Sequence, residues 1–249
     1  MLERVDLTQV LTKEEYETRL IPLQEKLLLF QHELYVRKRA MVIVFEGWDA
    51  AGKGGAIRRI TERLDSRGYE VFPIAAPAGE DRTHHYLFRF WRRLLAPTEK
   101  QIQIFDRSWY GRVMVERVEG FCSQPAWKRA YREMNEFEHQ LVSAGFILAK
   151  FWLHISPEEQ EMRFSDRQTN AAKSWKLTDE DWRNREKWPL YLEAVEEMLV
   201  KTSTLTAPWT VVEANDKYFA RIKVLETVVG AIQASLNLLP PDRKGKKKK

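Results

Sequence analysis

The chain of 249 residues is 44% hydrophobic, so it is long and apolar enough to bury the core of one large domain. Its net charge of +5 comes from the last eight residues, 242–249, because the rest of the chain has equal numbers of acidic and basic side chains. This distribution predicts a basic disordered tail and excludes a uniformly basic body. With a single cysteine, Cys122, and no apolar run long enough to cross a bilayer, we expect a cytoplasmic protein.

The predicted elements begin with a helix and then alternate between strands and helices. Thr12 and Glu15 form a capping-box pattern that opens the first helix, and Pro22 predicts a kink or break within it. The apolar run 41–45 then predicts a buried strand, which a glycine-rich loop follows directly. Further strands are predicted at 70–74, 102–105, 146–154 and 209–213. Helices are predicted at 12–37, from the glycine-rich loop to 67, and at 125–144, 157–168, 178–201 and 217–237.

Three local signals mark the ends of these helices. Gly68 is expected to cap the second helix, and Ser123 and Ser156 each precede a helix that starts with proline. The alternation of strands and helices with short loops predicts an α/β fold, with a mostly parallel sheet of about five strands and helices on both faces. We expect one three-layer domain over residues 1–241.

The loop after the first strand, FEGWDAAGKGGAI at 45–57, matches a phosphate-binding loop up to the metal-binding position. The pattern G-x-x-x-x-G-K is complete, but Gly54 stands where Ser or Thr normally supplies a hydroxyl to Mg²⁺. Between a buried strand and a helix, backbone N–H groups of such a loop converge on an anion, and the lysine reaches the outer phosphates. The predicted phosphate-binding residues are Gly47, Ala50, Ala51, Gly52, Lys53, Gly54 and Gly55.

Two aspartates are candidates to replace the missing hydroxyl. Asp106 ends the apolar strand of IQIFDRSWYGR, which is the form of a Walker B element, although an aspartate there can also simply cap a helix. Asp49 lies in the phosphate loop, where a carboxylate would repel a phosphate unless a cation stood between them. We therefore predict that Asp49 and Asp106 hold Mg²⁺.

The segment 82–117 is the most basic part of the body and carries a charge of +5. Its stretch 84–95, HHYLFRFWRRLL, has helical spacing, so the arginines either stay in solvent beside buried aromatic residues or form a basic wall for a polyanion. Arg112 and Arg117 are candidate phosphate-binding residues there. His84, His85 and His154 have no partners at metal-ligand spacing, and we do not expect a zinc site.

Together the motifs resemble the second family of polyphosphate kinases. GWDAAGKGG, FDRSWYGR, RFSDRQTNAAKSWKL and WTVVEANDKYFAR carry the resemblance, which runs from about residue 12 to 235. It implies a P-loop kinase fold like that of thymidylate kinase, with a helical lid at about 160–188. It also implies Mg²⁺-dependent phosphoryl transfer between inorganic polyphosphate and nucleotides, and a homo-oligomer, either a dimer or a tetramer. The implied catalytic residues are Asp49, Lys53, Asp106, Arg107, Glu116, Arg163 and Arg167.

The lid residues have some support of their own. Arg163 and Arg167 are four residues apart and so share a helix face, although such pairs are often solvated on a surface helix. Lys173 and Lys176 follow, in a stretch that departs from the D-P-x-K-x-W-K common in the family. We expect all four side chains to bind phosphate and exclude water.

Several functions remain open at this level. AMP is the expected acceptor, because the segment looks closer to the AMP-phosphorylating branch: Gly111 stands where many diphosphate-using relatives have Asn. We expect Gly111 to free space beside the phosphates, and Arg112 could clamp an α-phosphate. Transfer to nucleoside diphosphates (ADP to ATP, GDP to GTP) and an ATP-dependent kinase of a small molecule are the alternatives. A non-catalytic RNA or polyanion binder is disfavoured, since no basic sheet face with stacked aromatic residues is legible. Polyphosphate is favoured as donor, because basic side chains extend beyond the reach of one triphosphate.

Overall fold

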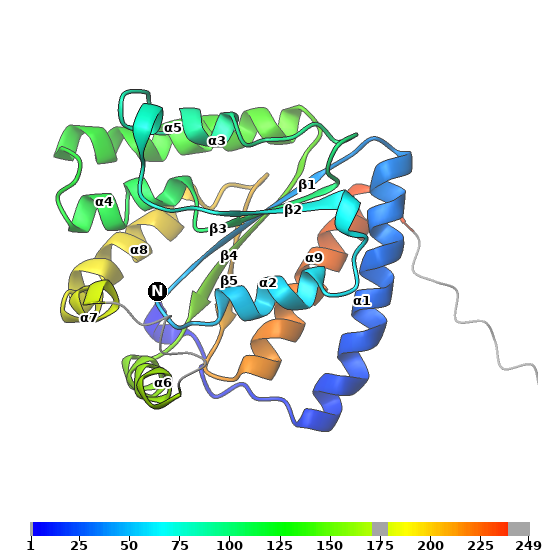
Figure 1. The fold of residues 1–249 in the computed structure, drawn as a ribbon, viewed down its shortest axis with the longest axis horizontal. Coiled ribbons are helices and arrows are strands. Elements are labelled where there is room, and N and C mark those ends of the chain that lie inside the picture. Colours follow the sequence, from blue (N-terminus) through cyan, green and yellow to red (C-terminus); the bar gives the residue numbers. More distant parts are fainter. Residues whose placement is uncertain (1, 171–178, 239–249) are drawn as a thin grey trace, which may run out of the picture.

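A computed structural model describes residues 2–170 and 179–238 of the chain. Within these residues the centre of the fold is a five-stranded sheet in the order β2-β3-β1-β4-β5, in which every neighbouring pair is parallel (Figure 1). The five strands fall where they were predicted, to within two residues at either end. Their bounds are β1 Met41–Gly47, β2 Tyr69–Pro73, β3 Ile102–Asp106, β4 Ile147–His154 and β5 Trp209–Glu213.

Helices cover both faces of the sheet, as expected for a three-layer α/β domain. α1, α2 and α9 pack together on one face, and α4, α5 and α8 lie on the other (Figure 1). The helix bounds are α1 Lys13–Val36, α2 Lys53–Thr61, α3 Phe88–Trp91, α4 Val115–Val118, α5 Gln124–Ser143, α6 Pro157–Thr169, α7 Asp179–Glu186, α8 Trp188–Thr202 and α9 Lys217–Ser235. Short 3₁₀ helices occupy η1 Leu2–Arg4, η2 Ser66–Gly68, η3 Gly79–Arg82 and η4 Trp109–Arg112.

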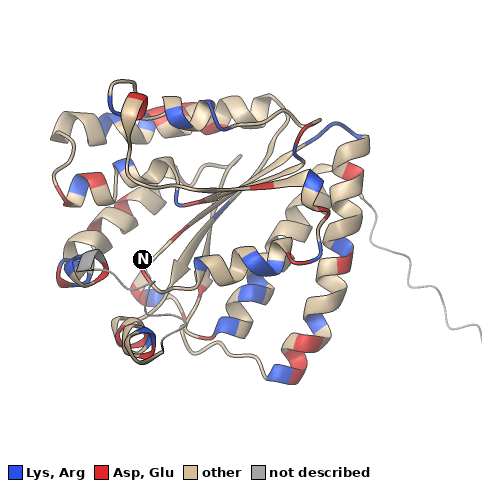
Figure 2. Ribbon diagram, viewed as in Figure 1, with Lys and Arg blue, Asp and Glu red and all other residues tan. Residues whose placement is uncertain are grey.

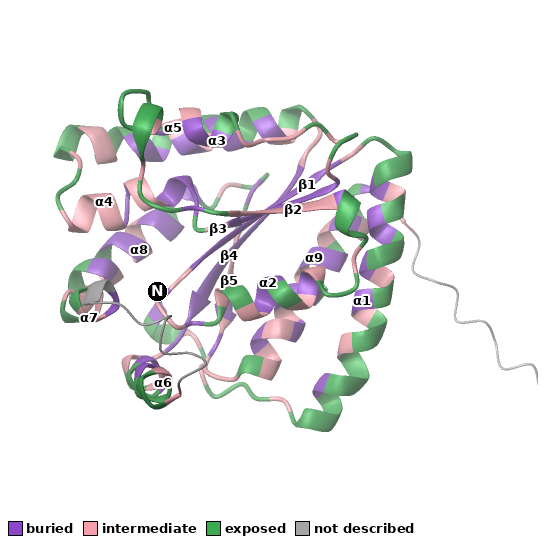
Figure 3. Cartoon of the chain, viewed as in Figure 1, coloured by how far each residue is buried: buried purple, intermediate pink, exposed green. Residues whose placement is uncertain are grey.

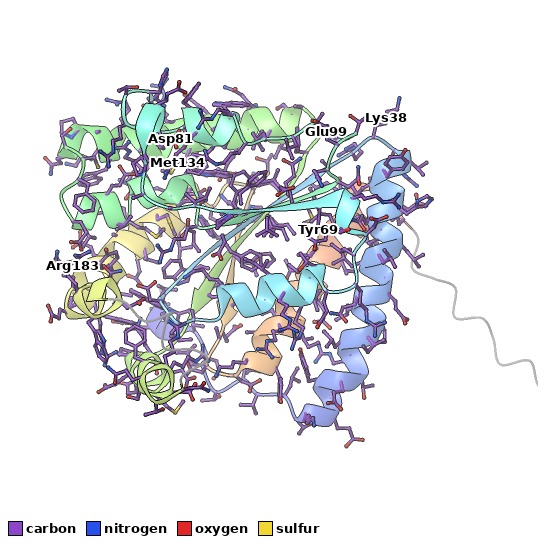
Figure 4. The ribbon with its side chains drawn as sticks, viewed as in Figure 1. Lys38, Tyr69, Asp81, Glu99, Met134 and Arg183 are labelled. Atoms are coloured by element: carbon purple, nitrogen blue, oxygen red, sulfur yellow. The ribbon has the colours of Figure 1, made fainter. Side chains whose placement is uncertain are left out.

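The core lies along the central strands. β4 is buried along its whole length, and β1 and β3 are buried except at their last residues, whereas the edge strands β2 and β5 are mostly half-buried (Figure 3). Met134 of α5, labelled in Figure 4, is fully buried. None of the described helices is both long and apolar enough to cross a membrane.

The start of α1 was predicted correctly, but its proline does not break the helix. The Thr12 hydroxyl accepts a hydrogen bond from the Glu15 N–H at 3.2 Å, and the Glu15 carboxylate accepts one from the Thr12 N–H at 2.8 Å. The helix continues through Pro22 to Val36. It loses one backbone hydrogen bond there, but side chains on both sides of the proline bond to α9: Arg19 donates to Glu226 at 2.7 Å, and Lys26 donates to Gln233 at 2.7 Å.

The second helix ends earlier than predicted. α2 stops at Thr61, and the Asp65 side chain accepts a hydrogen bond from the Arg67 N–H at 2.9 Å to open η2 instead. Gly68 is therefore not the cap of α2. A Cβ on Gly68 would lie 2.5 Å from the Gln31 amide nitrogen and 2.6 Å from the Gln101 amide oxygen, so a larger residue there would have to displace two buried side chains.

The predicted helix 178–201 is two helices. α7 ends at Glu186 and α8 begins at Trp188 with Pro189 in its first turn, where the missing N–H costs nothing. Ser156 caps α6 through the Glu159 N–H at 3.2 Å, whereas Ser123 precedes α5 without a side-chain cap. Lys173 and Lys176, like the tail 242–249, lie outside the described residues.

The arginine-rich stretch 84–95 contains only the four helical residues of α3, and its arginines serve the local fold. Arg89 is buried and donates to the Ala75 carbonyl at 2.8 Å. Arg92 pairs with Asp81 at 3.1 Å, and Arg93 lies 3.7 Å from the same carboxylate. None of these three arginines lines the phosphate cleft described below, so they do not form a wall of it; Arg92 stays exposed, and Arg89 is buried.

Candidate active site

The two predicted phosphate motifs meet because β1 and β3 are neighbours in the sheet. Phe45 pairs with Asp106 in parallel register, so the loop that follows β1 and the turn that follows β3 emerge at the same edge. A cleft of about 930 Å³ opens there. Its charged lining comes from five parts of the chain: Asp49 and Lys53, Asp106 and Arg107, Arg163 with Asp166 and Arg167 on α6, Asp181 on α7, and Lys217 with Arg221 on α9. Figure 2 shows how basic and acidic residues are distributed over α2, α6 and α9 around this edge.

The glycines of the loop differ in whether their position in the fold requires a glycine. Gly47 has a φ of 150°, and a Cβ there would lie 2.6 Å from the Leu153 carbonyl oxygen on β4. Gly52, which precedes α2, has a left-handed φ of 105°. A Cβ on Gly54 would meet nothing within 4 Å, so the absent hydroxyl is not excluded by crowding. All seven predicted loop residues except Gly47 line the cleft.

Lys53 begins α2 and folds back over its own loop. Its Nζ donates to the Gly47 carbonyl at 2.8 Å and to the Trp48 carbonyl at 3.1 Å. Burial lowers the pKa of this ammonium, although the Asp49 carboxylate opposes the shift. The lysine is thus held at the mouth of the loop, next to the backbone that would surround a phosphate.

Asp49 is bonded from two sides. Its Oδ1 accepts from Arg107 Nη2 at 3.2 Å, and its Oδ2 accepts from the Asn184 amide of α7 at 3.0 Å. Arg107 follows Asp106 with a left-handed φ of 65°, which directs its side chain across to the loop. The structure therefore brings the predicted metal residues Asp49 and Asp106, together with Lys53 and Arg107, to one cleft.

Arg163 and Arg167 both line the cleft, but Arg163 is mainly a structural tie. Its side chain is 5% exposed, and it donates to the carbonyls of Ala50 at 2.9 Å and of Ala214 at 2.7 Å. It also forms an ion pair with Glu159 at 2.5 Å. Arg163 thereby joins α6 to the phosphate loop and to the end of β5, which sequence spacing alone could not indicate.

Three predicted site residues lie elsewhere. Arg112 pairs with Glu116 at 2.8 Å and lies over the ring of Tyr86 at 4.6 Å. Arg117 is held by Glu197 at 2.6 Å and Glu193 at 2.8 Å, both on α8. None of Arg112, Glu116 and Arg117 lines the cleft. Gly111 does not line it either, and a Cβ there would meet Val115 at an ordinary 3.7 Å, so the expectation that Gly111 frees space beside the phosphates is not supported.

Sequence reasoning missed several residues of this site. Lys217 and Arg221 lie one turn apart at the start of α9, and their position directly after β5 was a usable signal, since all parallel strands end at the same edge. Asn184 gave no signal, because only the tertiary fold brings α7 to the loop. Glu46, buried at the end of β1, accepts a hydrogen bond from Ser108 Oγ at 2.7 Å. Burial raises the pKa of Glu46 to about 7, with the Ser108 hydrogen bond opposing the shift.

Comparisons with known proteins show which proteins the chain is similar to. The chain is 52% identical over 94% of its length to a polyphosphate:AMP phosphotransferase of Pseudomonas aeruginosa, and 39% identical over 89% to an ADP-polyphosphate phosphotransferase of Rhizobium meliloti. It spans about half the length of the first of these, 47%, and 72% of the second.

Solved structures show the same fold. The crystal structure of polyphosphate kinase 2 from Arthrobacter aurescens TC1 is 30% identical and superposes with a TM-score of 0.89, covering 99% of this chain and 89% of that one. The family model for polyphosphate kinase 2 (PPK2) matches residues 10–238. On the strength of these matches and of the shared motifs, the chain belongs to the polyphosphate kinase 2 family.

Proposed function

We propose that this chain transfers a phosphoryl group from inorganic polyphosphate to AMP, giving ADP, in a Mg²⁺-dependent reaction. The observation that carries the proposal is the single cleft that joins Lys53 and two aspartates to cations from three further segments. A linear polyanion needs such charges over more than one phosphate. The name of the 52% identical relative supports AMP as acceptor, whereas relatives named for ADP are 39–40% identical.

The residues present fit a magnesium ion. Mg²⁺ is usually held by one or two carboxylates together with substrate phosphates and water, and Asp49 and Asp106 supply two carboxylates in one cleft. Among the described residues no group of three metal-ligating side chains exists, so a site completed by the substrate is the better match. When bound, Mg²⁺ would neutralise charge on the transferring phosphates.

The protein's own groups would then orient and screen the reactants. The loop N–H groups and the start of α2 would bind a phosphate. Lys53 lies beside the loop and would contact the transferring phosphoryl group. Arg107 and Arg167 add charge that stabilises the moving phosphoryl group. Lys217 and Arg221 extend the cationic lining along α9 and would bind phosphates further along a chain donor. Arg163 contributes indirectly, by fixing the loop.

The test is to incubate the pure protein with Mg²⁺ and long-chain polyphosphate, and to measure initial rates with AMP and with ADP. We expect ADP from AMP, and no product from Lys53→Ala. Asp49→Asn and Asp106→Asn should each lower kcat by ~10³, about 4 kcal/mol of transition-state stabilisation. Asp65→Asn is the matched control, because Asp65 is exposed, precedes η2 and does not line the cleft. Rapid conversion of ADP with AMP untouched would overturn the acceptor, and activity with ATP alone would overturn the donor.

We also propose a homo-oligomer, on the family resemblance alone. Light scattering at several protein concentrations decides it, and a monomer of 29.5 kDa throughout would contradict the proposal.

A further inference from the structure

A charged pair lies in the core, away from the cleft. Lys150 of β4 and Glu138 of α5 have side chains that are 0% and 1% exposed, and Lys150 Nζ lies 2.7 Å from Glu138 Oε2. Neither residue lines the cleft. Taking both charges out of water is costly, and a well-packed apolar pair at such a position is often just as stable. Stability alone therefore does not account for this pair.

The remaining hydrogen bonds of the pair converge on Trp109 and Tyr110. Glu138 Oε1 accepts from the Tyr110 hydroxyl at 2.6 Å and from the Trp109 indole N–H at 3.0 Å. Lys150 Nζ donates to the Tyr110 hydroxyl at 2.9 Å and to the Thr202 carbonyl at 2.7 Å. Because these bonds are directional and charge-assisted, they fix the position of both rings more closely than apolar packing would.

Trp109 and Tyr110 belong to the same turn as the candidate catalytic residues. They begin η4, which follows Asp106 and Arg107 after one intervening residue, Ser108. Ser108 Oγ donates to Glu46 at 2.7 Å and accepts from the Tyr110 N–H at 3.3 Å. The 106–110 turn is thus held at one end by β3 and Glu46, and at the other by the buried pair.

The conformation of this turn needs such support. Arg107 has a φ of 65°, a left-handed backbone that costs a non-glycine residue free energy and persists only when its surroundings fix it. We infer that Glu138 and Lys150 are positioning residues, which hold the 106–110 turn so that Asp106 and Arg107 face the phosphate cleft. This inference rests on the proposed function for its effect on catalysis, but not for its effect on the turn.

The experiment compares single and double variants. Glu138→Gln and Lys150→Met alone each leave one buried charge unpaired, and we expect the melting temperature to fall by roughly 10 °C. The double variant Glu138→Leu/Lys150→Met removes both charges, but it also removes the partners of the Trp109 N–H, the Tyr110 hydroxyl and the Thr202 carbonyl, so it should regain only part of that loss. It should nevertheless show kcat reduced by at least about 10-fold, KM for the nucleotide within about 2-fold, and faster hydrogen exchange in the peptide 102–114.

A variant that removes a single hydroxyl group can test the inference even if the other variants do not fold. Tyr110→Phe removes one hydroxyl and should lower kcat in the same way, while Tyr16→Phe, which removes a buried hydroxyl bonded to Arg59 on the opposite side of the sheet, should not. A stable double variant with wild-type kcat and wild-type exchange in 102–114 would overturn the inference. If the wild-type protein had no phosphotransferase activity, the proposed function would fail, and the exchange measurement would still decide the role of the pair.

Discussion

The side-chain amide of Asn184 donates a hydrogen bond of 3.0 Å to Oδ2 of Asp49, across 135 residues of sequence. It ties α7 to the phosphate loop at the carboxylate that we propose as a metal ligand. Groups that orient a ligating carboxylate typically change metal affinity by 10- to 100-fold when removed. Asn184 is therefore expected to set how well Asp49 can take up Mg²⁺.

Replacing Asn184 tests this role directly. In Asn184→Ala, we expect the Mg²⁺ concentration for half-maximal rate to rise by about 10-fold with little loss of stability. Asn135→Ala is the matched control, because Asn135 also donates one amide hydrogen bond, to the Lys201 carbonyl at 3.0 Å, and lies on α5 away from the cleft. An unchanged Mg²⁺ dependence in Asn184→Ala would show that this hydrogen bond does not affect the metal.

The two arginines of α6 should fail in different ways. Arg163→Ala leaves the carbonyls of Ala50 and Ala214 and the Glu159 carboxylate without their partner, so we expect a loss of about 3 kcal/mol in the free energy of unfolding. Arg167→Ala should lose kcat rather than nucleotide affinity, because its charge is needed most while the phosphoryl group is moving. Urea unfolding and initial rates separate the two effects. If Arg163→Ala is as stable as the wild-type protein, the buried hydrogen bonds of Arg163 contribute less to the free energy of unfolding than we infer.

The glycines of the loop should differ in their tolerance of a methyl group. Gly47→Ala places a Cβ 2.6 Å from backbone oxygen of β4, and we expect the protein to be strongly destabilised. Gly54→Ala meets open space inside α2, where alanine is favoured by up to about 1 kcal/mol, and should unfold at a higher temperature than wild type. Gly54→Ser would restore the hydroxyl of the common motif, and we expect it to fold and retain activity. Thermal melting of Gly47→Ala at the wild-type temperature would contradict the packing argument.

The buried Glu46 makes stability depend on pH. Its pKa is raised to about 7 from 4.5, so between these values the folded protein binds a proton that the unfolded chain releases. The free energy of unfolding should therefore fall as pH rises from about 4.5 to 7, by about 3 kcal/mol from this group. Glu46→Gln should lose that part of the dependence, while the exposed Glu17→Gln should keep it. Urea unfolding at pH 5 and pH 8 is the measurement, and identical pH dependence in wild type and Glu46→Gln would refute the prediction.

The sheet and the centre of the site were predictable for a physical reason. Buried parallel strands are continuous apolar runs, as at 41–45, and the residues that follow them must lie at one edge of the sheet. This rule predicted that Asp49, Lys53 and Asp106 lie close together, and the structure has all three in one cleft. Side-chain partners were not predictable in the same way. Helical spacing placed Arg163 and Arg167 on one face, but it could not show that Arg163 is buried against loop carbonyls.

Arg117 and Asn184 also show that the sequence does not predict side-chain partners: Arg117 was a candidate that lies outside the cleft, and Asn184 was missed. The sequence made Arg117 a candidate phosphate ligand by its basic surroundings, yet the fold brings Glu193 and Glu197 from α8 against it. Asn184 had no distinguishing context, yet it contacts the centre of the site. In both cases the deciding contacts join residues more than 70 positions apart, and no local pattern encodes them.

The pairing of Phe45 with Asp106 limits where the chain can change its length. Deleting one residue within β3 would draw Asp106 back by about 3.3 Å and turn its side chain to the opposite face of the sheet. The connection at 74–101 between β2 and β3 contains no strand, so insertions and deletions there do not change the register between β1 and β3. Tyr86, Leu87 and Phe90 of that connection are buried, whereas residues 82–85 are exposed. Length variation among natural relatives, and designed insertions of reporter or affinity segments, should therefore be tolerated at 82–85 and eliminated from the two strands.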